Sequence, residues 1–289
     1  MGDLCVVVLA AGEGRRLRPL TELLPKALCP VGNVALLDRA LDRVAALGLT
    51  GPADVAVNAC YLADRVVGHV GDRAHLSVEP GDPLGTSGGV GNLRDWVAGR
   101  GVLVVNADAY HADPYDTAAH ASAYGSGLGV AARIGALLDG WDGESVRLLG
   151  QPVADPRQVG LFSGQRFAGF SLLPWRRVRD LAPTPSELVR TVWRPAEAAG
   201  ELTVVTFDGV FIDTGTPRDY LAANLHAAGG ANLVEGTVTG RAVRSVVGAG
   251  ALVAGEVVDS VVWPGATVAP GERLDHAVRA GQGLTVAGR

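Results

Sequence analysis

Apolar residues near the amino terminus alternate between short β-branched runs and stretches with helical spacing. The short runs predict buried strands at Leu4–Ala10, Asp54–Asn58, His75–Glu79 and Val102–Asn106. Between these runs, apolar residues three or four positions apart predict helices at Leu36–Leu47, Leu62–Val70 and Gly89–Val97. Because strands that alternate with helices form right-handed parallel units, we expect an α/β fold: a Rossmann-like, mostly parallel sheet with helices on both faces.

The middle of the chain has a less regular pattern. Further apolar runs predict strands at Leu128–Ile134, Phe167–Leu173, Thr203–Phe207 and Val210–Asp213. Helices are predicted at Ser186–Ala199, which begins with a serine cap, and at Thr216–Ala227, which has Pro217 in its first turn. We expect residues 1–229 to form one domain.

The pattern changes after Gly229. Residues 230–289 are rich in Val, Ala and Gly, and apolar residues recur six positions apart, at Val247 and Val253 and again at Val262, Val268 and Leu274. Such a period is typical of hexapeptide repeats in a left-handed parallel β-helix, so we expect a short β-helix-like segment; an irregular β-rich tail is the alternative. Because only two or three coils fit, we expect the segment to pack on the rest of the chain or on a second copy in a homodimer.

Charge and cysteine content exclude several classes of protein. The 289 residues carry a formal charge of −5 without a basic stripe, so a nucleic-acid partner is not expected. No apolar segment is long enough to span a membrane, and the amino terminus has no signal-peptide pattern, so we expect a cytoplasmic protein. Cys5, Cys29 and Cys60 have the spacing of neither a disulfide framework nor a zinc site.

Lys26 is the only lysine among 25 Lys and Arg residues. It stands next to Pro25, after the segment Gly12-Glu13-Gly14-Arg15-Arg16-Leu17-Arg18-Pro19. Glycines let a backbone approach phosphate groups closely, and a lysine ammonium reaches a phosphate from many directions. The segment therefore predicts a polyphosphate contact on an extended loop; a solvated surface lysine is the alternative. It is neither a dinucleotide fingerprint, because Leu17 replaces the third glycine, nor a P-loop.

Two carboxylates stand at strand ends. Asp108 follows the predicted strand Val102–Asn106, and Asp213 ends the predicted strand Val210–Asp213. Ligands of open α/β folds bind at the carboxyl edge of the sheet, and Mg²⁺ favours one or two carboxylates together with phosphate oxygens and water. We therefore expect Asp108 and Asp213 to hold Mg²⁺; taken singly, each could equally be a helix cap or a turn residue.

Two glycine-containing segments complete the candidate chemistry. Gly85-Thr86-Ser87-Gly88-Gly89 lies between a predicted strand and a predicted helix, where it could admit a flat base or form an ordinary turn. Gly169 interrupts the predicted strand Phe167–Leu173, as expected for close approach of a ligand or for a bulge.

The stretch Leu9–Lys26 resembles the signature of the sugar-1-phosphate nucleotidyltransferases, G-x-G-x-R-L-x-P-L-T-x-x-x-P-K. The resemblance covers about residues 4–227 and implies attack of a sugar 1-phosphate on an NTP, release of pyrophosphate and Mg²⁺ as cofactor. It implies catalytic roles for Arg16, Lys26 and Asp108, and metal binding by Asp108 and Asp213. It also implies nucleotide contacts from Leu9, Ala11, Gly12, Gly14, Glu79, Gly85, Thr86 and Ser87, and sugar-phosphate contacts from Asn106, Arg157, Gly169 and Asp213.

One departure from the family pattern leaves the substrates open. Many members carry a second lysine in an E-K-P segment; here Arg157, or in second place Arg147 or Arg166, is expected to replace it. The run Pro83-Leu84-Gly85-Thr86 looks like mannose-1-phosphate guanylyltransferases, so GTP is favoured over UTP. The segment from Leu148 to Phe162 looks more like uridylyltransferases of an amino-sugar 1-phosphate. A non-catalytic nucleotide-sugar-binding regulatory paralogue is the alternative from another class, and a dinucleotide-dependent oxidoreductase is a distant third.

Overall fold

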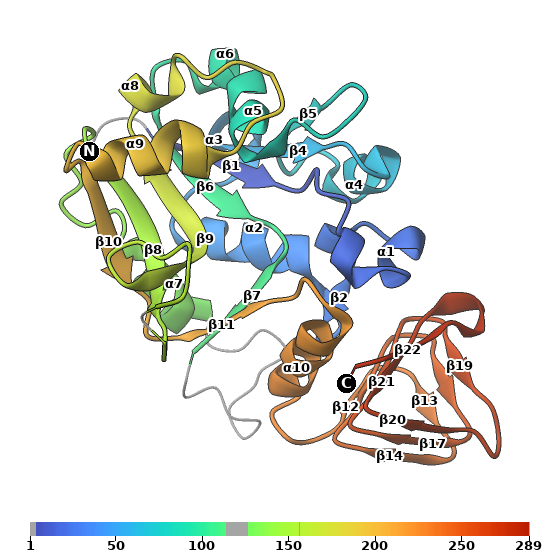
Figure 1. Cartoon of the computed structure of the whole chain (residues 1–289). Coiled ribbons are helices and arrows are strands. Elements are labelled where there is room, and N and C mark those ends of the chain that lie inside the picture. The colour runs from blue at the N-terminus through green and yellow to red at the C-terminus, as the bar shows by residue number, and fades with distance from the viewer. Residues whose placement is uncertain (1–3, 114–126, 156, 289) are drawn as a thin grey trace. The chain divides into compact units, whose positions relative to one another are not determined.

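The computed structural model describes residues 4–113, 127–155 and 157–288, which fall into two compact units (Figure 1). Unit 1 comprises Met1–Glu13, Ala40–Ala107 and Gly127–Phe211. Unit 2 comprises Gly14–Arg39, Asp108–Ser126 and Ile212–Arg289. The domain boundary expected at residue 229 stays a prediction.

Unit 1 is built on a seven-stranded sheet with the order β10-β8-β9-β6-β1-β4-β5. Its strands are β1 (Leu4–Leu9), β4 (Val55–Ala59), β5 (His75–Val78), β6 (Gly101–Asn106), β8 (Val146–Pro152), β9 (Gln165–Leu173) and β10 (Leu202–Thr206). All neighbouring pairs are parallel except those of β9, which runs antiparallel to both β6 and β8. The expected mostly parallel α/β sheet is confirmed.

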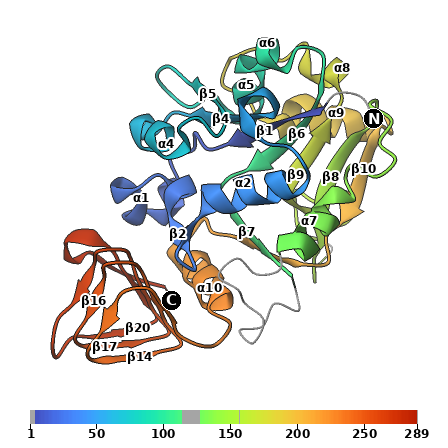
Figure 2. The ribbon, with the colours of Figure 1, turned by 180° about the vertical axis from the view of Figure 1, so that it is seen from behind.

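Helices cover both faces of this sheet (Figures 1 and 2). In β1, Cys5 and Val7 point into one core cluster while Val6 and Val8 alternate with them, and all four side chains are fully buried. The cluster is covered by α5 (Gly85–Asn92), α6 (Arg94–Val97) and α9 (Arg194–Ala198). Figure 2 shows α2 (Leu36–Ala46) and α7 (Gly127–Gly135) on the opposite face. The remaining helical segments of unit 1 are α3 (Gly51–Asp54), α4 (Ala63–Val70), α8 (Trp175–Val178) and the π-helical turn η3 (Val189–Trp193).

The strand predicted at Leu128–Ile134 is wrong, because this segment forms the helix α7. Val130, Ala131, Ile134 and Leu137 are buried, whereas Ala132 between them is exposed. This spacing of three and four puts the apolar side chains on one helical face, and a half-buried strand would require alternation instead.

Several boundaries also differ from the sequence prediction. The helix expected from Gly89 begins at Gly85, and the one expected from Ser186 begins at the π-helical turn Val189–Trp193. The loop after Gly14 is not extended, because it contains the helical turns η1 (Arg15–Leu17), α1 (Leu20–Leu23) and η2 (Lys26–Leu28). Four strands were not expected from the sequence: β8 and the short strands β2 (Pro30–Val31), β3 (Val34–Ala35) and β7 (Ala109–Ala112).

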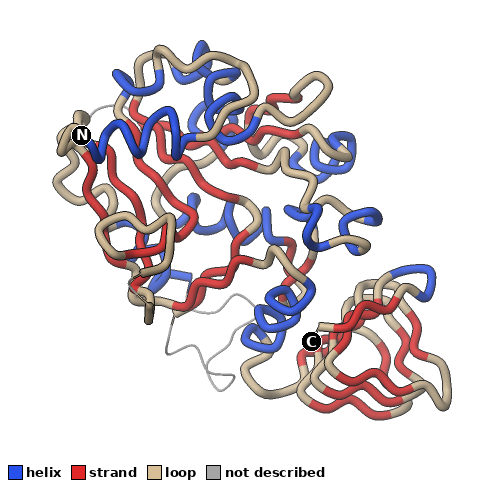
Figure 3. The backbone as a smooth tube through the Cα atoms, in the orientation of Figure 1, coloured by secondary structure: helices blue, strands red, loops and turns tan. Residues whose placement is uncertain are grey.

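Unit 2 contains a β-helix with three parallel ladders (Figure 3). The first ladder has β12 (Leu233–Val234), β15 (Val246–Val247), β18 (Val261–Val262) and β21 (Ala277–Arg279), and β22 (Thr285–Ala287) joins it antiparallel. The second has β13 (Thr237–Val238), β16 (Leu252–Val253) and β19 (Thr267–Val268). The third has β14 (Arg241–Val243), β17 (Glu256–Val258) and β20 (Arg273–Asp275). A β-helix-like segment is therefore confirmed.

The predicted six-residue spacing holds at Val247 and Val253 and at Val262, Val268 and Leu274, which are all buried, but it does not continue around every side of the coil. Val247 and Val253 both point inward, but the next inward residue is Val257, only four positions later. Partners in adjacent coils, such as Val246 and Val261, are 15 residues apart, whereas Val261 and Val278 are 17 apart. The mixture of four-, five- and six-residue spacings arises because corner residues between the ladders vary in number.

Helix α10 (Pro217–Ala227) lies beside the β-helix within unit 2 (Figure 3). As expected, Pro217 is in its first turn, and the Thr216 side chain caps it by accepting a hydrogen bond from the Asp219 backbone N–H. In the part of the chain that the structure describes, no helix combines the length and the hydropathy that crossing a membrane requires.

Candidate active site

A cluster of charged side chains in unit 2 contains the residues predicted to bind phosphate and metal. Lys26 is only 5% exposed, and its Nζ donates to Asp108 Oδ2 at 2.9 Å and to Asp213 Oδ1 at 3.3 Å. Arg16 Nη2 lies 3.2 Å from Asp213 Oδ2. Residues far apart in sequence thus form one ion-paired group, and the alternative of a solvated surface lysine is wrong.

The local backbone explains how Lys26 reaches this position. Gly14 has φ 61°, and a Cβ added there would lie 2.9 Å from both Lys26 Cβ and Thr21 Cγ2. The Thr21 hydroxyl donates to the Gly14 carbonyl at 3.1 Å, which folds the loop back on itself. The glycine therefore provides both the left-handed backbone and the space for the lysine stem.

Two short strands bring the aspartates together. Asp108 precedes β7, and Asp213 ends β11 (Val210–Asp213), which pairs with β7. The buried Thr214 hydroxyl donates to the Asp108 carbonyl oxygen at 2.8 Å and so links the two strand ends. A Cβ on Gly215 would lie 2.6 Å from Arg16 Nη2, so this glycine leaves room for the guanidinium.

The electrostatics of the cluster keep Asp213 charged. Burial by itself would raise the pKa of the Asp213 carboxyl. The charge of Lys26 and the hydrogen bonds from Lys26 and Arg16 outweigh burial, and the pKa is held below its ordinary value. Asp213 is therefore ionised at neutral pH and available as an anionic ligand.

The two carboxylates fit a hard divalent cation. Both contact the same ammonium nitrogen, so both can contact one metal ion placed between them. Within the described ranges there is no group of three or more His, Cys, Asp or Glu side chains arranged to hold a metal. A cation at Asp108 and Asp213 would take its remaining ligands from phosphate oxygens and water, which is the coordination that Mg²⁺ prefers.

In unit 1, the predicted nucleotide-binding residues surround the carboxyl ends of the central strands. Leu9 lies in register with Asn58 on one side and with Asn106 on the other, so the strand-end positions of β1, β4 and β6 are adjacent. After β1, Ala11 is nearly buried and its carbonyl accepts the Tyr61 N–H at 3.4 Å, whereas Gly12 is exposed. Gly12 therefore leaves its backbone open to a ligand.

The Glu79 carboxylate is buried in unit 1 and holds two neighbouring segments together. Asn58 Nδ2 donates to Glu79 Oε1 at 2.6 Å, and the Leu84 N–H donates to Glu79 Oε2 at 2.8 Å. The Asn58 amide oxygen in turn accepts the Ala10 N–H at 2.7 Å. Glu79 thus connects the loop after β1 with the turn before α5, and its predicted contact with the nucleotide stays a prediction.

Replacing Gly89 by Ala should destabilise unit 1 by about 1–3 kcal/mol, the usual cost of overpacking. A Cβ at Gly89 would lie 2.6 Å from Asn58 Nδ2 and 3.0 Å from Glu79 Oε1. Gly68→Ala in α4 is the matched control, because its Cβ would meet no atom within 4 Å and Ala favours a helix by about 1 kcal/mol. Thermal unfolding should show a lower Tm for the first variant only; equal Tm values would contradict the packing argument.

Four of the eight residues of α5 are glycines, and three of them, Gly85, Gly88 and Gly91, form a face that packs tightly. A Cβ at Gly85, Gly88 or Gly91 would lie within 2.6 Å of a carbonyl oxygen of Ala182, Thr184 or Ser186. The Ser87 N–H donates to the Ser186 carbonyl at 2.9 Å, and the Ser186 N–H donates to the Leu84 carbonyl at 3.0 Å. The predicted base-binding segment is therefore the first turn of a helix held by a second segment of unit 1.

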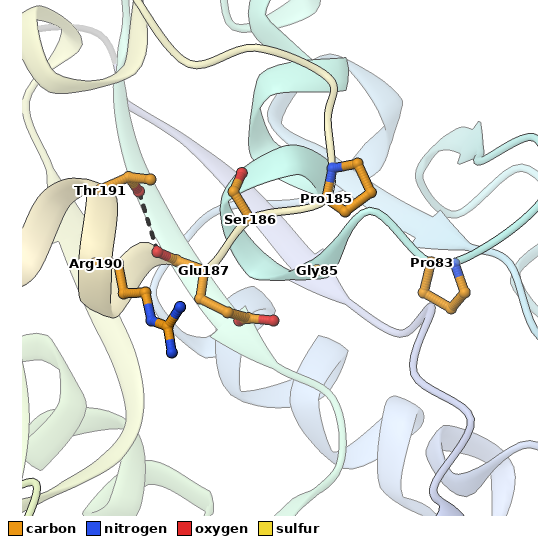
Figure 4. A pocket seen from close by; sticks show the side chains of 7 residues that line it. All are labelled: Pro83, Gly85, Pro185, Ser186, Glu187, Arg190 and Thr191. Carbon is orange, nitrogen blue, oxygen red and sulfur yellow. Dashed lines mark hydrogen bonds between the residues drawn. The ribbon is translucent and has the colours of Figure 1, made fainter.

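A pocket of about 380 Å³ lies at this helix start (Figure 4). It is lined by Pro83, Gly85, Pro185, Ser186, Glu187, Arg190 and Thr191. The Thr86 hydroxyl donates to Glu187 Oε2 at 2.7 Å, and the Thr191 hydroxyl donates to Ser87 Oγ at 2.8 Å. Glu187, Arg190 and Thr191 were not predicted as site residues, because no local motif marks them; the partners of Glu187 and Thr191 lie about 100 residues away in sequence.

The three arginines predicted as candidates for binding the sugar phosphate differ in how accessible their guanidinium groups are to a ligand. Arg147 donates to the carbonyls of Leu137, Asp139 and Gly140, so its guanidinium holds a loop. Arg166 stacks over Phe211 and donates to Gln151 Oε1 at 2.7 Å. Arg157 is 89% exposed and pairs with Asp155, which leaves it accessible.

Gly169 lies in a bulge of β9. It has φ 82°, and the register of β8 and β9 shifts between Leu148 and Gly150. The bulge explains the glycine structurally. Its predicted contact with the sugar stays a prediction.

Comparisons with known proteins agree with this chemistry. Residues 6–142 match the family described as MobA-like NTP transferase domain. Mannose-1-phosphate guanylyltransferase of Mycobacterium tuberculosis is 27% identical over 94% of this chain and 78% of that protein. N-acetylmuramate alpha-1-phosphate uridylyltransferase of Caulobacter vibrioides is 28% identical over 77% of this chain and 96% of that protein.

A solved structure supports the fold. A putative glucose-1-phosphate thymidylyltransferase from Bacillus anthracis, in complex with a sucrose, aligns with a TM-score of 0.56 at 19% identity. The alignment covers 78% of this chain and 95% of that one. This likeness shows the fold, and the sequence matches show that the chain is similar to nucleotidyltransferases named for sugar 1-phosphate substrates.

Proposed function

We propose that the protein is a mannose-1-phosphate guanylyltransferase, which forms GDP-mannose and pyrophosphate from GTP and mannose 1-phosphate with Mg²⁺. The observation that carries the proposal is the cluster of Lys26, Arg16, Asp108 and Asp213, which joins phosphate-binding cations to two metal-binding carboxylates. The guanylyltransferase relative, which matches 94% of the chain, supports the choice of substrates.

The reaction needs no nucleophile from the protein. A phosphate oxygen of the sugar 1-phosphate forms a bond to the α-phosphorus of GTP, and the bond from that phosphorus to the bridging oxygen of pyrophosphate breaks. Pyrophosphate leaves with the electron pair, so catalysis consists of in-line positioning and charge neutralisation. Lys26 and Arg16 would neutralise the triphosphate and the leaving pyrophosphate. Asp108 and Asp213 would hold Mg²⁺, which polarises the phosphoryl group when bound.

A feature of the pocket in unit 1 favours guanine over uracil. Guanine presents two adjacent donors, N1–H and N2–H₂, and a carboxylate has two oxygens that can accept both. Uracil presents one N–H between two carbonyl oxygens, which a carboxylate repels. The Glu187 carboxylate lines the pocket beside Gly85, and Thr86 orients it by donating to Oε2.

Glu187→Gln should lower the ratio of kcat/KM for GTP to that for UTP by about tenfold or more, because the amide can accept at only one end. The measurement is pyrophosphate release across a grid of NTPs and sugar 1-phosphates with Mg²⁺. Glu197→Gln is the control. Glu197 pairs with Arg194 within α9 and does not line the pocket. An unchanged GTP-to-UTP ratio would remove Glu187 from base recognition.

The second candidate function is uridylyl transfer to an amino-sugar 1-phosphate. The relative from Caulobacter vibrioides favours it, and so does the absence of a second lysine from the sequence. The same grid separates the two functions, because maximal rate with UTP and N-acetylmuramate 1-phosphate would replace the first proposal. A blank grid, with nucleotide sugars still raising the Tm, would contradict both.

A further inference from the structure

Tyr220 in α10 links the β-helix to the segment that follows Lys26. Its side chain is fully buried, and its hydroxyl donates to the Pro30 carbonyl and accepts from Trp263 Nε1 at 2.9 Å. The two rings meet edge to face, with centroids 6.3 Å apart. Burial raises the pKa of Tyr220 far above its ordinary value, so the hydroxyl keeps the proton that it donates.

The backbone between Lys26 and Pro30 has little freedom. The Leu28 N–H donates to the Pro25 carbonyl at 2.8 Å, and the Cys29 N–H donates to the Lys26 carbonyl at 3.0 Å. A displacement of Pro30 is therefore transmitted through one closed turn to the Cα of Lys26.

β2 and β3 pair antiparallel and form a hairpin that begins at Pro30, and this hairpin has two further anchors in unit 2. The Gly32 N–H donates to the buried Asn224 Oδ1 of α10 at 3.0 Å. Asn33 Nδ2 donates to the carbonyl of Val247 in the β-helix at 3.2 Å. These contacts make α10 and the β-helix a common support for the hairpin.

The same helix also follows the metal-binding carboxylates. Asp213 lies four residues before Pro217, the first residue of α10, and Thr214 between them bonds the Asp108 carbonyl. Helix α10 therefore holds the hairpin after Lys26 and is also directly connected to the segment that positions both aspartates. Since both carboxylates contact Lys26 Nζ, small shifts of α10 would change these distances.

We propose that Trp263 and Tyr220 form a positioning pair, through which the β-helix sets the place of Lys26 in the active site. The proposal rests on the proposed function only for its kinetic consequence. Because a misplacement of about 1 Å can cost about 100-fold in rate, loss of the pair should lower kcat. The KM for the sugar 1-phosphate should change little, because no residue of the pair contacts that substrate in the proposed reaction.

The first test uses Trp263→Phe, which keeps an aromatic ring and removes the N–H donor. Trp193→Phe is the matched control: its ring is buried to a similar degree, and its Nε1 has no hydrogen-bond partner among the described residues. We expect kcat to fall about tenfold or more in Trp263→Phe and to stay within about twofold of wild type in the control. Equal kcat values for the two variants would overturn the proposal.

A double-mutant cycle shows whether the pair acts through Lys26. In a Lys26→Met background, Trp263→Phe should cause almost no further loss of kcat, because the group that it positions is gone. A full additional loss would assign Trp263 a general structural role instead. Tyr220→Phe should behave like Trp263→Phe in both backgrounds, since it removes the hydroxyl that joins Trp263 to Pro30.

A second readout does not depend on enzymatic activity. Because Lys26 is the only lysine, its acylation by an amine-reactive ester can be followed by peptide mass spectrometry without interference from other lysines. Lys26 is 5% exposed, so labelling should be slow in wild type and Trp193→Phe, and about tenfold faster in Trp263→Phe. Unchanged labelling would overturn the pair, whereas faster labelling in a protein with a blank substrate grid would overturn only the proposed function.

Discussion

Replacing Asp108 by Asn should abolish pyrophosphate release while leaving the protein folded. The amide cannot supply the anionic oxygen that a divalent cation requires, so we expect a loss of about 10³-fold or more in kcat. The fold should survive because Lys26 keeps its contact with Asp213, and the Tm should stay within about 3 °C of wild type. The measurements are steady-state kinetics, with one substrate varied while the other is saturating, at several Mg²⁺ concentrations, and thermal unfolding.

The control for this variant is Asp259→Asn. Asp259 also belongs to unit 2 and also pairs with a cation, Arg244, but it lies in the β-helix away from the charged cluster. Its kcat should remain near wild type. A near-normal kcat for Asp108→Asn would remove Asp108 from the metal site, and Mn²⁺ binding measured by electron paramagnetic resonance would then have to be assigned to other carboxylates.

Lys26→Arg should lose activity by about 10²-fold although it preserves the charge. The lysine stem is buried against Gly14, and its ammonium contacts two carboxylates at 2.9 and 3.3 Å. The longer, planar guanidinium cannot occupy this space with the same contacts. Steady-state kinetics should show the loss mainly in kcat, because in the proposed reaction the charge of Lys26 acts on the leaving pyrophosphate.

Lys26→Met separates charge from shape. Lys26 is one of the groups that hold the pKa of Asp213 down, so its removal should raise that pKa and leave two facing carboxylates with less compensation. We expect a larger loss of kcat than for Lys26→Arg. Near-normal activity of Lys26→Arg would show that the positive charge at position 26 suffices and that the shape of lysine is not required.

The central parallel strands β1, β4 and β6 could be predicted because they are buried on both faces. β1 and β6 read as uninterrupted apolar runs, and their observed bounds differ from the prediction by one residue at one end. The candidates Arg16 and Lys26 could be selected because a contiguous signature marks them, and Asp108 and Asp213 because they stand at strand ends; the structure brings all four into one cluster, and their binding of phosphate and metal stays a prediction. The ion pairs between these cations and aspartates could not be predicted in detail, because they form only when the three segments meet in the fold.

The rest depended on contacts that leave no local pattern. α7 combines β-branched residues, which favour strands, with apolar positions at helical spacing, and the spacing corresponds to the observed structure. Glu187 accepts a hydrogen bond from Thr86, and Trp263 donates one to Tyr220, across long separations in sequence. Neither pair has a motif, because one hydrogen bond between distant side chains constrains only two positions. The shorter spacings of the β-helix were not predicted, because the number of residues at its corners varies from coil to coil.

The glycine-rich helix α5 has a consequence for cooperativity of folding. Each glycine costs a helix about 1 kcal/mol relative to Ala, so four of them in eight residues make this helix unstable in isolation. It persists because Ala182–Glu187 packs on its glycine face. A fragment cut to residues 6–142, the part that matches the family domain, would lack that segment. Such a fragment should show rapid amide exchange throughout α5, because the contacts that Ser186 and Glu187 make with its first turn come from residues about a hundred positions later in the chain.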